Sequence, residues 1–436
     1  MTQASTSRSL WQGGGGVSSG KPSSRDANAL RRPALYTFFA FEVFCMTFLQ
    51  KIVIPINLGS LGGPVQVVLP LTYAALFVLI FFVKIKVDIN RLLLMSAFFI
   101  AATISIMAQP NPYSANSVLL MAAVYLPFIL YIEVSESTFL KLVKIYINFM
   151  LFFGCIAFLQ YVTEFIWTWR VWPNLDKIVP PAFLFDGFVY MQGIKVGSQW
   201  MKPTGVVFLE ISYLSQWTAI ALALELVYFR RLWRMIFFGV VLFACFAGTG
   251  LLLLIISGPV LASRLSRRSL LMVGLVMVAC VITIFAIDWV GQVQHRFLEF
   301  QHTNTSGHNR FITPFDVLAN FSEHISAVWT GDGPGSGDKS KNEFWWVITK
   351  LTYEYGYMTT ISFFAFFVYV IFNGAPSQRI SFMMLIFYNF MGGFIIPVYP
   401  LLVFLLVGLF RIRQPKPETS SSSSGKRSSS SVPAPA

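Results

Sequence analysis

Long apolar stretches separated by short polar connections dominate the sequence between Ala34 and Phe410. Stretches of about 17 to 25 residues can cross the hydrocarbon core of a bilayer as helices. In lipid they must be helical, because every backbone donor and acceptor has to be satisfied internally. The pattern predicts about twelve membrane-spanning helices, over residues 34–55, 65–83, 92–108, 117–132, 139–162, 206–229, 235–247, 251–262, 270–290, 346–372, 380–394 and 398–410. The shorter ranges are also compatible with re-entrant pairs or single bent helices.

The composition agrees with a chain that folds in lipid. Hydrophobic residues make up 56% of the sequence, charged residues make up 12%, and the mean hydropathy is +0.66. Ordinary water-soluble domains carry about 25% charged residues. The fold class that we expect is therefore an all-α, polytopic membrane helix bundle.

Lysine and arginine residues cluster in alternate connections, which predicts an orientation. Short connections on the cytoplasmic side of a membrane carry an excess of basic residues. Residues 109–116 and 248–250 carry none, which fits the opposite face. The basic set comprises Arg25, Arg31, Arg32, Lys84, Lys86, Arg91, Lys141, Lys144, Arg230, Arg231, Arg234, Arg264, Arg267, Arg268, Arg411 and Arg413. We expect this set and both termini to lie in the cytoplasm.

Two polar segments flank the apolar region. Residues 1–32, rich in Gly and Ser, and residues 414–436, rich in Ser and Pro, have the composition of disordered cytoplasmic tails, so 33–413 is expected to form the membrane domain. The net charge of +13 is explained by cytoplasmic anchors beside anionic lipid headgroups, so the bilayer is the expected partner and nucleic acid is not. The four cysteines fall inside predicted spans and are expected to pack as small apolar residues.

Two long connections fall on the predicted outer face, at residues 163–205 and 291–345, and we expect the chemistry of the protein there. Arg296 and Arg310 carry planar, permanently charged groups that suit a diphosphate, and Lys202 adds a cation beside the sixth span. An equally open interpretation is that these residues pair with nearby acids. The second connection also holds all four histidines, His295, His302, His308 and His324. Without cysteines or paired histidine spacing, it does not favour a metal site.

Acidic residues inside apolar ranges are costly and are functional candidates by default. Glu210 lies near the outer end of the sixth predicted span, where it is either a catalytic carboxylate or a buried partner for Lys202 or a tyrosine hydroxyl. Glu354 lies in the tenth span one helical turn after Lys350, so these two side chains are also spaced to pair with each other.

The glycine-rich residues 331–340, with the sequence GDGPGSGDKS, do not form a nucleotide-binding loop. That pattern needs Gly followed directly by Lys and then Ser or Thr, whereas Asp338 separates Gly337 from Lys339. Two interpretations remain open: a tight turn whose amides hold a sugar phosphate, or a plain flexible turn.

The order of these residues resembles the bacterial O-antigen polymerase and ligase superfamily, which includes exopolysaccharide repeat-unit polymerases. The resemblance covers most of residues 34–413. It rests on Pro203-Thr204-Gly205 followed by Glu210 and Ser212-Tyr213-Leu214, on Ala247-Gly248-Thr249-Gly250, and on the order Arg310, Trp329 to Gly335, Asn342 and Glu354-Tyr355-Gly356. Lys202 stands where many members have Arg. Lys341 stands where ligase-like members often have His, which favours a polymerase.

The resemblance implies a membrane glycosyltransferase (GT-C-like) in the bacterial inner membrane that acts on undecaprenyl-diphosphate-linked oligosaccharides at the periplasmic face, without a cofactor or metal. A sugar hydroxyl would attack the anomeric carbon of the growing chain while the polyprenyl diphosphate leaves, a step that needs a base and cations. The expected catalytic residues are Glu210, His308 and Arg310. The expected substrate-binding residues are Lys202, Arg296, Lys341, Asn342, Tyr213 and Glu354.

Three alternatives remain. A ligase of the same superfamily would transfer a finished glycan to another acceptor, and a flippase would move the lipid-linked sugar across the membrane. A structural scaffold of an export machine would carry out no reaction. A transporter favours internal repeats and charged residues along several spans, whereas this chain concentrates its ionisable groups in the two outer connections. For a polymerase, a chain-length regulator and an export complex are further candidate partners.

Overall fold

We describe a computed structural model of the chain. The structure describes residues 24–56, 63–109, 113–167, 171–185, 188, 191–194, 200–263, 267, 270–271, 274–275, 278, 302–303, 305–321, 328–336, 346–391 and 393–413.

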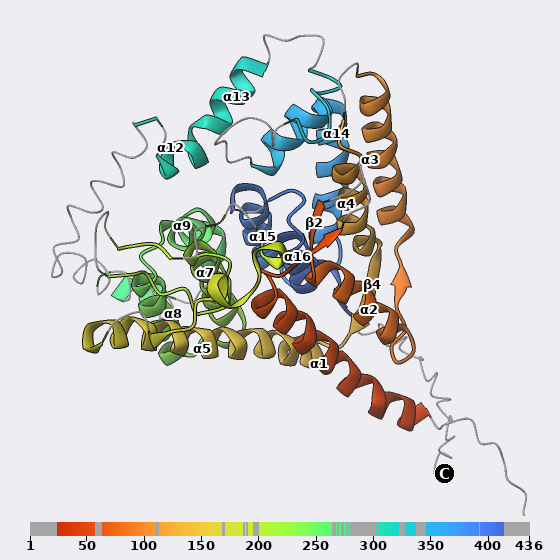
Figure 1. Cartoon of the computed structure of the whole chain (residues 1–436). Coiled ribbons are helices and arrows are strands. Elements are labelled where there is room, and N and C mark those ends of the chain that lie inside the picture. The colour runs from red at the N-terminus through yellow and green to blue at the C-terminus, as the bar shows by residue number, and fades with distance from the viewer. Residues whose placement is uncertain are drawn as a thin grey trace, which may run out of the picture.

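The described part of the chain is mostly helical (Figure 1). Its α-helices are α1 (Ser24–Phe48), α2 (Val68–Ile80), α3 (Ile89–Met107), α4 (Ala115–Tyr125), α5 (Glu136–Ile166), α6 (Leu175–Ile178), α7 (Ile211–Leu224), α8 (Leu232–Ala244), α9 (Gly248–Ala262), α12 (Ser306–Phe311), α13 (Thr313–Phe321), α14 (Val347–Phe372), α15 (Gln378–Met391) and α16 (Val398–Val403). The 3-10 helices η2 (Leu126–Ile129) and η4 (Pro181–Phe183) and the π-helices η5 (Glu225–Phe229) and η7 (Phe404–Gly408) complete them.

Within the described residues, three helices are long and apolar enough to cross a membrane: Ile89–Met107, Glu136–Glu164 and Val347–Phe372. Shorter apolar helices occupy five of the other predicted ranges: Val68–Ile80, Ala115–Ile129, Leu232–Ala244, Gly248–Ala262 and Val398–Gly408. Helices α1, α7 and α15 lie in three more, and residues 270–290 fall largely outside the described part. In Figure 1, α3 and α14 stand side by side, α7, α8 and α9 lie on the opposite side of the bundle, and α15 and α16 lie between these groups.

The expectation of an all-α fold needs one correction, because short strands terminate two of the predicted spans. Helix α1 ends at Phe48, and β1 (Val53–Ile56) then pairs antiparallel with β2 (Gly63–Gln66). Helix α4 tightens into η2 at Pro127 and continues as strand β4 (Leu130–Val134). Proline has no amide hydrogen to donate, which ends the regular helix here, and β-branched residues favour the extended backbone that follows.

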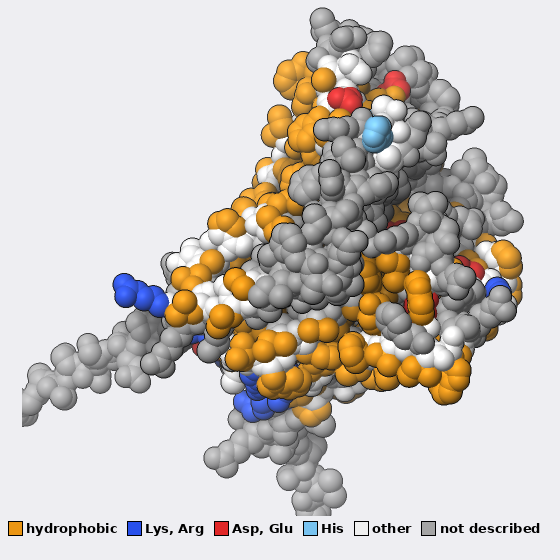
Figure 2. Space-filling view, turned by 90° about the vertical axis from the view of Figure 1, so that its left-hand side faces the viewer, with side chains coloured by type: hydrophobic (Ala, Val, Ile, Leu, Met, Phe, Trp, Pro, Cys, Tyr) orange, Lys and Arg blue, Asp and Glu red, His pale blue; other side chains and the backbone are white. Residues whose placement is uncertain are grey.

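A second small sheet closes the end of the bundle that carries many of the basic connections. Strand β4 lies between β3 (Lys86–Val87), to which it is antiparallel, and β5 (Phe410–Ile412), to which it is parallel. The Lys86 ammonium group donates a 2.6 Å hydrogen bond to Glu133 in β4. This bond and the nearby Arg413 guanidinium group lower the pKa of the Glu133 carboxyl group. Figure 2 shows a group of Lys and Arg side chains at the lower edge of the described surface, next to hydrophobic side chains.

Arg91 was expected in a cytoplasmic connection, but it lies in the first turn of α3 and is fully buried. Its guanidinium group donates to the backbone carbonyl oxygens of Phe128 (3.1 Å), Leu130 (3.0 Å), Gly408 (2.8 Å) and Val370 (3.1 Å). These carbonyls terminate segments that approach the same end of the bundle from different parts of the chain. Arg91 therefore works as a structural clamp between α3, β4, η7 and α14.

Helix α14 is interrupted at Gly356, whose backbone torsions are φ 76° and ψ 176°. This conformation is essentially restricted to glycine. The break divides the helix into two parts in the middle of a range that the sequence predicts as one continuous span.

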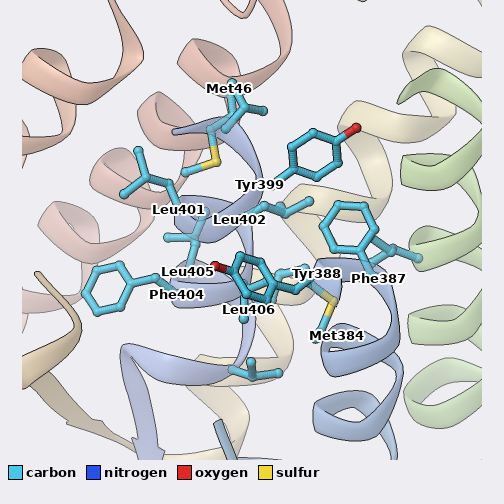
Figure 3. Close-up of a cluster of buried hydrophobic side chains, with 14 of the residues drawn as sticks. Met46, Met384, Phe387, Tyr388, Tyr399, Leu401, Leu402, Phe404, Leu405 and Leu406 are labelled. Atoms are coloured by element: carbon cyan, nitrogen blue, oxygen red, sulfur yellow. The ribbon is translucent and has the colours of Figure 1, made fainter. Parts of the chain in front are cut away.

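Aromatic and aliphatic side chains fill the core between α1, α15 and α16 (Figure 3). Tyr399 and Phe387 face each other there, with ring centroids 5.3 Å apart. Tyr399 also reaches the start of α7, and so this core supports the region described next.

Candidate functional site

A buried, non-helical segment, residues 201–210, leads from the first outer connection into α7. Side chains of α5 hold it from one side. The Gln160 side-chain oxygen accepts a 2.7 Å hydrogen bond from the Gly205 amide, and Glu164 accepts one from the Met201 amide. The sequence predicted helix from residue 206, but helix begins only at Ile211.

The region after α1 holds the other end of the same segment. The Gln50 side-chain oxygen accepts a hydrogen bond from the Leu209 amide at 3.1 Å, and its amide group donates to the Thr47 carbonyl at 3.0 Å. Gln66 in β2 donates to the Gln50 carbonyl at 2.8 Å, so the β1–β2 hairpin braces this contact. Buried amide side chains thus replace the backbone hydrogen bonds that a helix would supply.

The segment contains an unusual local backbone. Gly205 and Val206 have consecutive positive φ angles of 64° and 71°. A β-branched residue such as valine rarely adopts a positive φ, and such strain persists where the surroundings impose it, often at functional sites. The Thr204 hydroxyl oxygen accepts a hydrogen bond from the Val206 amide at 3.3 Å, which stabilises this turn. The motif Pro203-Thr204-Gly205, prominent in the sequence, therefore forms the turn that directs the chain toward Glu210.

Lys202 and Glu210 lie at the two ends of this segment, and both are buried. Glu210 occupies the position just before the first turn of α7, with an extended backbone, and the Ser212 hydroxyl donates a hydrogen bond to its carboxylate. The Lys202 backbone amide donates to the Gln192 carbonyl at 2.8 Å. The start of a helix favours a negative charge, which suits a carboxylate at Glu210.

Tyr213, in the first turn of α7, is almost completely buried between aromatic rings. Its ring centroid is 5.7 Å from that of Phe188 in the first outer connection and 4.9 Å from that of Tyr399. This connection therefore covers Tyr213, and Tyr213 lies one turn of helix from Glu210.

Lys51 is a buried cation in this region that the sequence analysis did not single out. Its side chain is 3% exposed and forms an ion pair with Asp176 of α6. The Lys51 carbonyl oxygen accepts a hydrogen bond from the Phe185 amide at 2.9 Å. This part of the first outer connection is therefore also held to Lys51 by a backbone hydrogen bond. The available signal was a lysine inside the first apolar range, which is unusual in a membrane segment.

The motif Ala247-Gly248-Thr249-Gly250 opens α9 directly beside α7. A side chain at Gly250 would lie 2.4 Å from the Ser215 carbonyl oxygen, so only glycine permits this approach. The Ser215 hydroxyl donates to the Ala247 carbonyl at 3.2 Å. Small residues at such crossings allow close helix packing in membranes. The structure therefore brings together two of the sequence motifs that carried the resemblance.

The second outer connection is described only in part. His308 lies in α12, where its ring nitrogen Nδ1 is 3.3 Å from the Thr313 hydroxyl. Arg310 belongs to the same helix, but its side chain lies outside the described residues. Arg296, Lys341 and Asn342 also lie outside them. In Figure 1, α12 and α13 lie at the end of the bundle opposite β4.

The glycine-rich turn is bound into the break in α14. The amides of Asp332 and Gly333 donate to the carbonyls of Tyr353 and Glu354, at 2.7 and 3.0 Å. These carbonyls would otherwise lack helical partners at the break. These two amides therefore do not bind a phosphate, as one interpretation of the sequence suggested, because they already donate hydrogen bonds to carbonyl oxygens of α14.

Backbone groups on the other side of the break also form hydrogen bonds with neighbouring segments. The Tyr357 amide donates to the Val328 carbonyl at 3.0 Å, and the Ser105 hydroxyl of α3 donates to the Tyr355 carbonyl at 2.8 Å. A side chain at Gly331 would lie 2.4 Å from the Tyr355 amide nitrogen. The two sequence motifs, 329–335 and 354–356, thus form one interlocked unit.

Glu354 and Lys350 form an ion pair within α14, with 3.6 Å between the carboxylate oxygen and the ammonium nitrogen. Both residues are buried just before the break. The predicted pairing is therefore present, and the pair lies next to the carbonyl that receives the Gly333 amide.

Within the part of the chain that the structure describes, no group of three or more His, Cys, Asp and Glu side chains is placed to hold a metal ion. No family model, curated protein or solved structure matches the chain. Its function is therefore inferred from its own residues.

Proposed function

We propose that this protein is a membrane glycosyltransferase that polymerises oligosaccharide repeat units linked to a polyprenyl diphosphate. The observation that carries the proposal is the braced segment 201–210, which has a buried cation at one end and a buried carboxylate at the other. Burying a charged group costs several kcal/mol. A buried charged residue within an apolar region is therefore a candidate for a functional role.

The roles follow from the chemistry of the transfer. The Glu210 carboxylate accepts the proton of the attacking sugar hydroxyl as the new bond to the anomeric carbon forms. The bond between that carbon and the diphosphate oxygen breaks, and the leaving diphosphate takes the electron pair. Lys202 and Lys51 stabilise the charge that develops on it, together with Arg310 and Arg296 of the second outer connection. His308 is the alternative base.

The remaining candidates bind substrate. Tyr213, packed between the rings of Phe188 and Tyr399, presents a surface for sugar rings once the outer connection moves. Glu354, Lys341 and Asn342 supply further polar groups on the side of the second connection. Lys51 is paired with Asp176 in the structure, and a bound diphosphate would replace the Asp176 carboxylate as its partner.

The membrane arrangement is part of the same proposal. About twelve helices cross the bacterial inner membrane, both termini lie in the cytoplasm, and the two outer connections face the periplasm. The basic sheet that holds Lys86 and Arg411, opposite α12 and α13, supports this orientation.

The test is the state of the lipid-linked intermediates in cells that carry Glu210→Gln or Lys202→Ala. We expect single repeat units to accumulate on the periplasmic side of the membrane while protein abundance stays normal. Glu136→Gln, which changes an exposed carboxylate at the start of α5, is the matched control and should leave chain length unchanged.

Other outcomes would contradict the proposal. Long glycans that remain on the carrier would identify a ligase, and intermediates trapped on the cytoplasmic side would identify a flippase. Normal long chains in both variants would show that segment 201–210 has no part in the reaction.

A further inference from the structure

A carboxyl group that the proposed reaction does not use lies in the apolar part of α1. Glu42 is the one charged residue between Ala34 and Phe48, and it is 1% exposed. Helices α2 and α5 pack against α1 on this part of the bundle. An acidic residue in such a position is expensive and calls for a partner or a neutral state.

The hydrogen-bond geometry around Glu42 bears on its protonation state. The Thr72 side-chain oxygen of α2 lies 2.8 Å from a Glu42 carboxyl oxygen and 3.0 Å from the Val68 carbonyl oxygen. A threonine hydroxyl has one hydrogen and cannot donate to both acceptors. If Thr72 donates to Val68, as is common within helices, the Glu42 carboxyl group must itself be the donor in the shorter contact.

The other surroundings agree with a neutral acid. Among the described residues, the second carboxyl oxygen of Glu42 has no hydrogen-bond partner. The titratable neighbour on the same helix is the Cys45 thiol, which is buried and carries no positive charge. The apolar stretch of α2 that faces α1, residues 68–80, has no charged side chain, and its Tyr73 hydroxyl donates elsewhere, to the Ala123 carbonyl.

The third packed element is α5. Its charged residues, Glu136, Lys141, Lys144 and Glu164, lie in its first turns and near its end, and none forms a described ion pair or hydrogen bond with Glu42. An ionised Glu42 would thus be a buried charge with a single hydroxyl donor, at a cost of several kcal/mol.

We propose that Glu42 is a proton-binding site between α1 and α2, and that it is protonated while these two helices are packed together. The proton completes the chain of hydrogen bonds from Glu42 through Thr72 to Val68. Its release would leave a charge between two apolar helices, so release requires the contact between α1 and α2 to open to water or to a cation. Protonation of Glu42 and closure of this contact are therefore one event. The inference is independent of the proposed glycosyl transfer.

The same property makes Glu42 a modification site for a hydrophobic carbodiimide. The protonated carboxyl group adds across a carbon–nitrogen double bond of the reagent, its oxygen bonding to the central carbon and its proton moving to nitrogen. The acyl group then migrates from oxygen to the other nitrogen and gives a stable N-acylurea, with no oxidation and no leaving group. An ionised carboxylate in water completes the first step more slowly, because it must first take up a proton.

The first experiment is infrared spectroscopy of the purified full chain in detergent at pH 7, compared with Glu42→Gln. Glutamine is isosteric with the neutral acid, so this variant should fold normally. We expect the wild type to show a carbonyl band of a protonated carboxyl group that the variant lacks. Thr72→Val should shift this band to higher frequency, because its hydrogen bond is lost. A wild-type spectrum without the band would overturn the inference.

The second experiment treats the wild type with dicyclohexylcarbodiimide at pH 7 and locates the product by peptide mass mapping. A free glutamate is protonated in about one part in 500 at this pH. We therefore expect the modified fraction at Glu42 to exceed that of a free glutamate by about a hundredfold, and to be larger than that at exposed Glu136. Equal modification of the two residues would contradict a neutral Glu42, and this result does not depend on any variant folding.

Discussion

The break in α14 leads to a sharp prediction for Gly356→Ala. A Cβ atom at this position would lie 2.2 Å from the Trp329 carbonyl oxygen and 2.5 Å from the Thr330 amide nitrogen. Both obstacles are backbone atoms, so no side-chain rotation relieves them. The φ of 76° adds a second cost, because residues with a Cβ atom avoid it.

The magnitude follows from these two terms. The disfavoured backbone conformation costs about 1–3 kcal/mol, and overpacking against a fixed neighbour costs about 1–3 kcal/mol. We expect Gly356→Ala to lower the free energy of unfolding by about 2–6 kcal/mol. The alternative for the variant is to displace the glycine-rich turn from the helix, which would expose the carbonyls of Tyr353 and Glu354.

The assay is thermal unfolding in detergent, followed with a thiol-reactive dye. Cys45 and Cys245 are buried free cysteines that react only on unfolding, and exposed Cys155 gives the baseline. The matched control is Gly258→Ala in α9, where a Cβ atom meets nothing within 4 Å. We expect a fall of the unfolding temperature on the order of 5 °C for Gly356→Ala and no fall for the control. Equal unfolding temperatures would show that the turn is not bound into the break.

Three further outcomes are expected, each measured by the same thermal assay. Arg91→Met should lower the stability by about 3–5 kcal/mol, because four buried carbonyls lose their donor, and a variant as stable as the wild type would refute the clamp. Glu133→Gln should cost less than about 1 kcal/mol at pH 7. Because Lys86 lowers the folded-state pKa of Glu133, this contribution is present above the unfolded-state value of about 4.3 and is lost as the pH falls through the folded-state value. Wild type and variant should therefore converge as the pH falls below the folded-state value, and a gap that does not narrow with acidification would contradict this. Gly250→Val should separate α9 from α7 and destabilise the protein more than Gly248→Val, since a Cβ atom at Gly248 meets nothing within 4 Å.

Apolar patterning predicted where the helices lie, but not where they change character. The boundaries of α3 and α5 agree with the predicted ranges to within a few residues, because long apolar runs leave little choice of structure. The strand after η2 and the break at Gly356 depend on contacts with distant segments, β5 and the glycine-rich turn. Hydrophobicity along the chain carries no information on such pairings.

In the candidate site, too, some residues could be predicted from the sequence, whereas others depend on contacts between distant segments. A carboxylate inside an apolar range was a visible signal, so Glu210 could be selected from the sequence, and its burial agrees. Lys51 was missed because its partner, Asp176, lies in a separate polar connection. Arg91 was assigned to a connection by its charge alone, although its role depends on carbonyls from four distant positions.

The parallel pairing of β4 with β5 has a consequence for how the protein is assembled. Ile132 pairs with Phe410, so this sheet joins parts of the chain that are far apart in sequence. During synthesis the earlier helices are made first, and such a distant contact forms only after the last helix has been made. Until then, Arg91 lacks the Gly408 carbonyl and the edge of β4 stays open. A nascent chain halted before residue 410 should therefore be a preferred substrate for quality-control proteases.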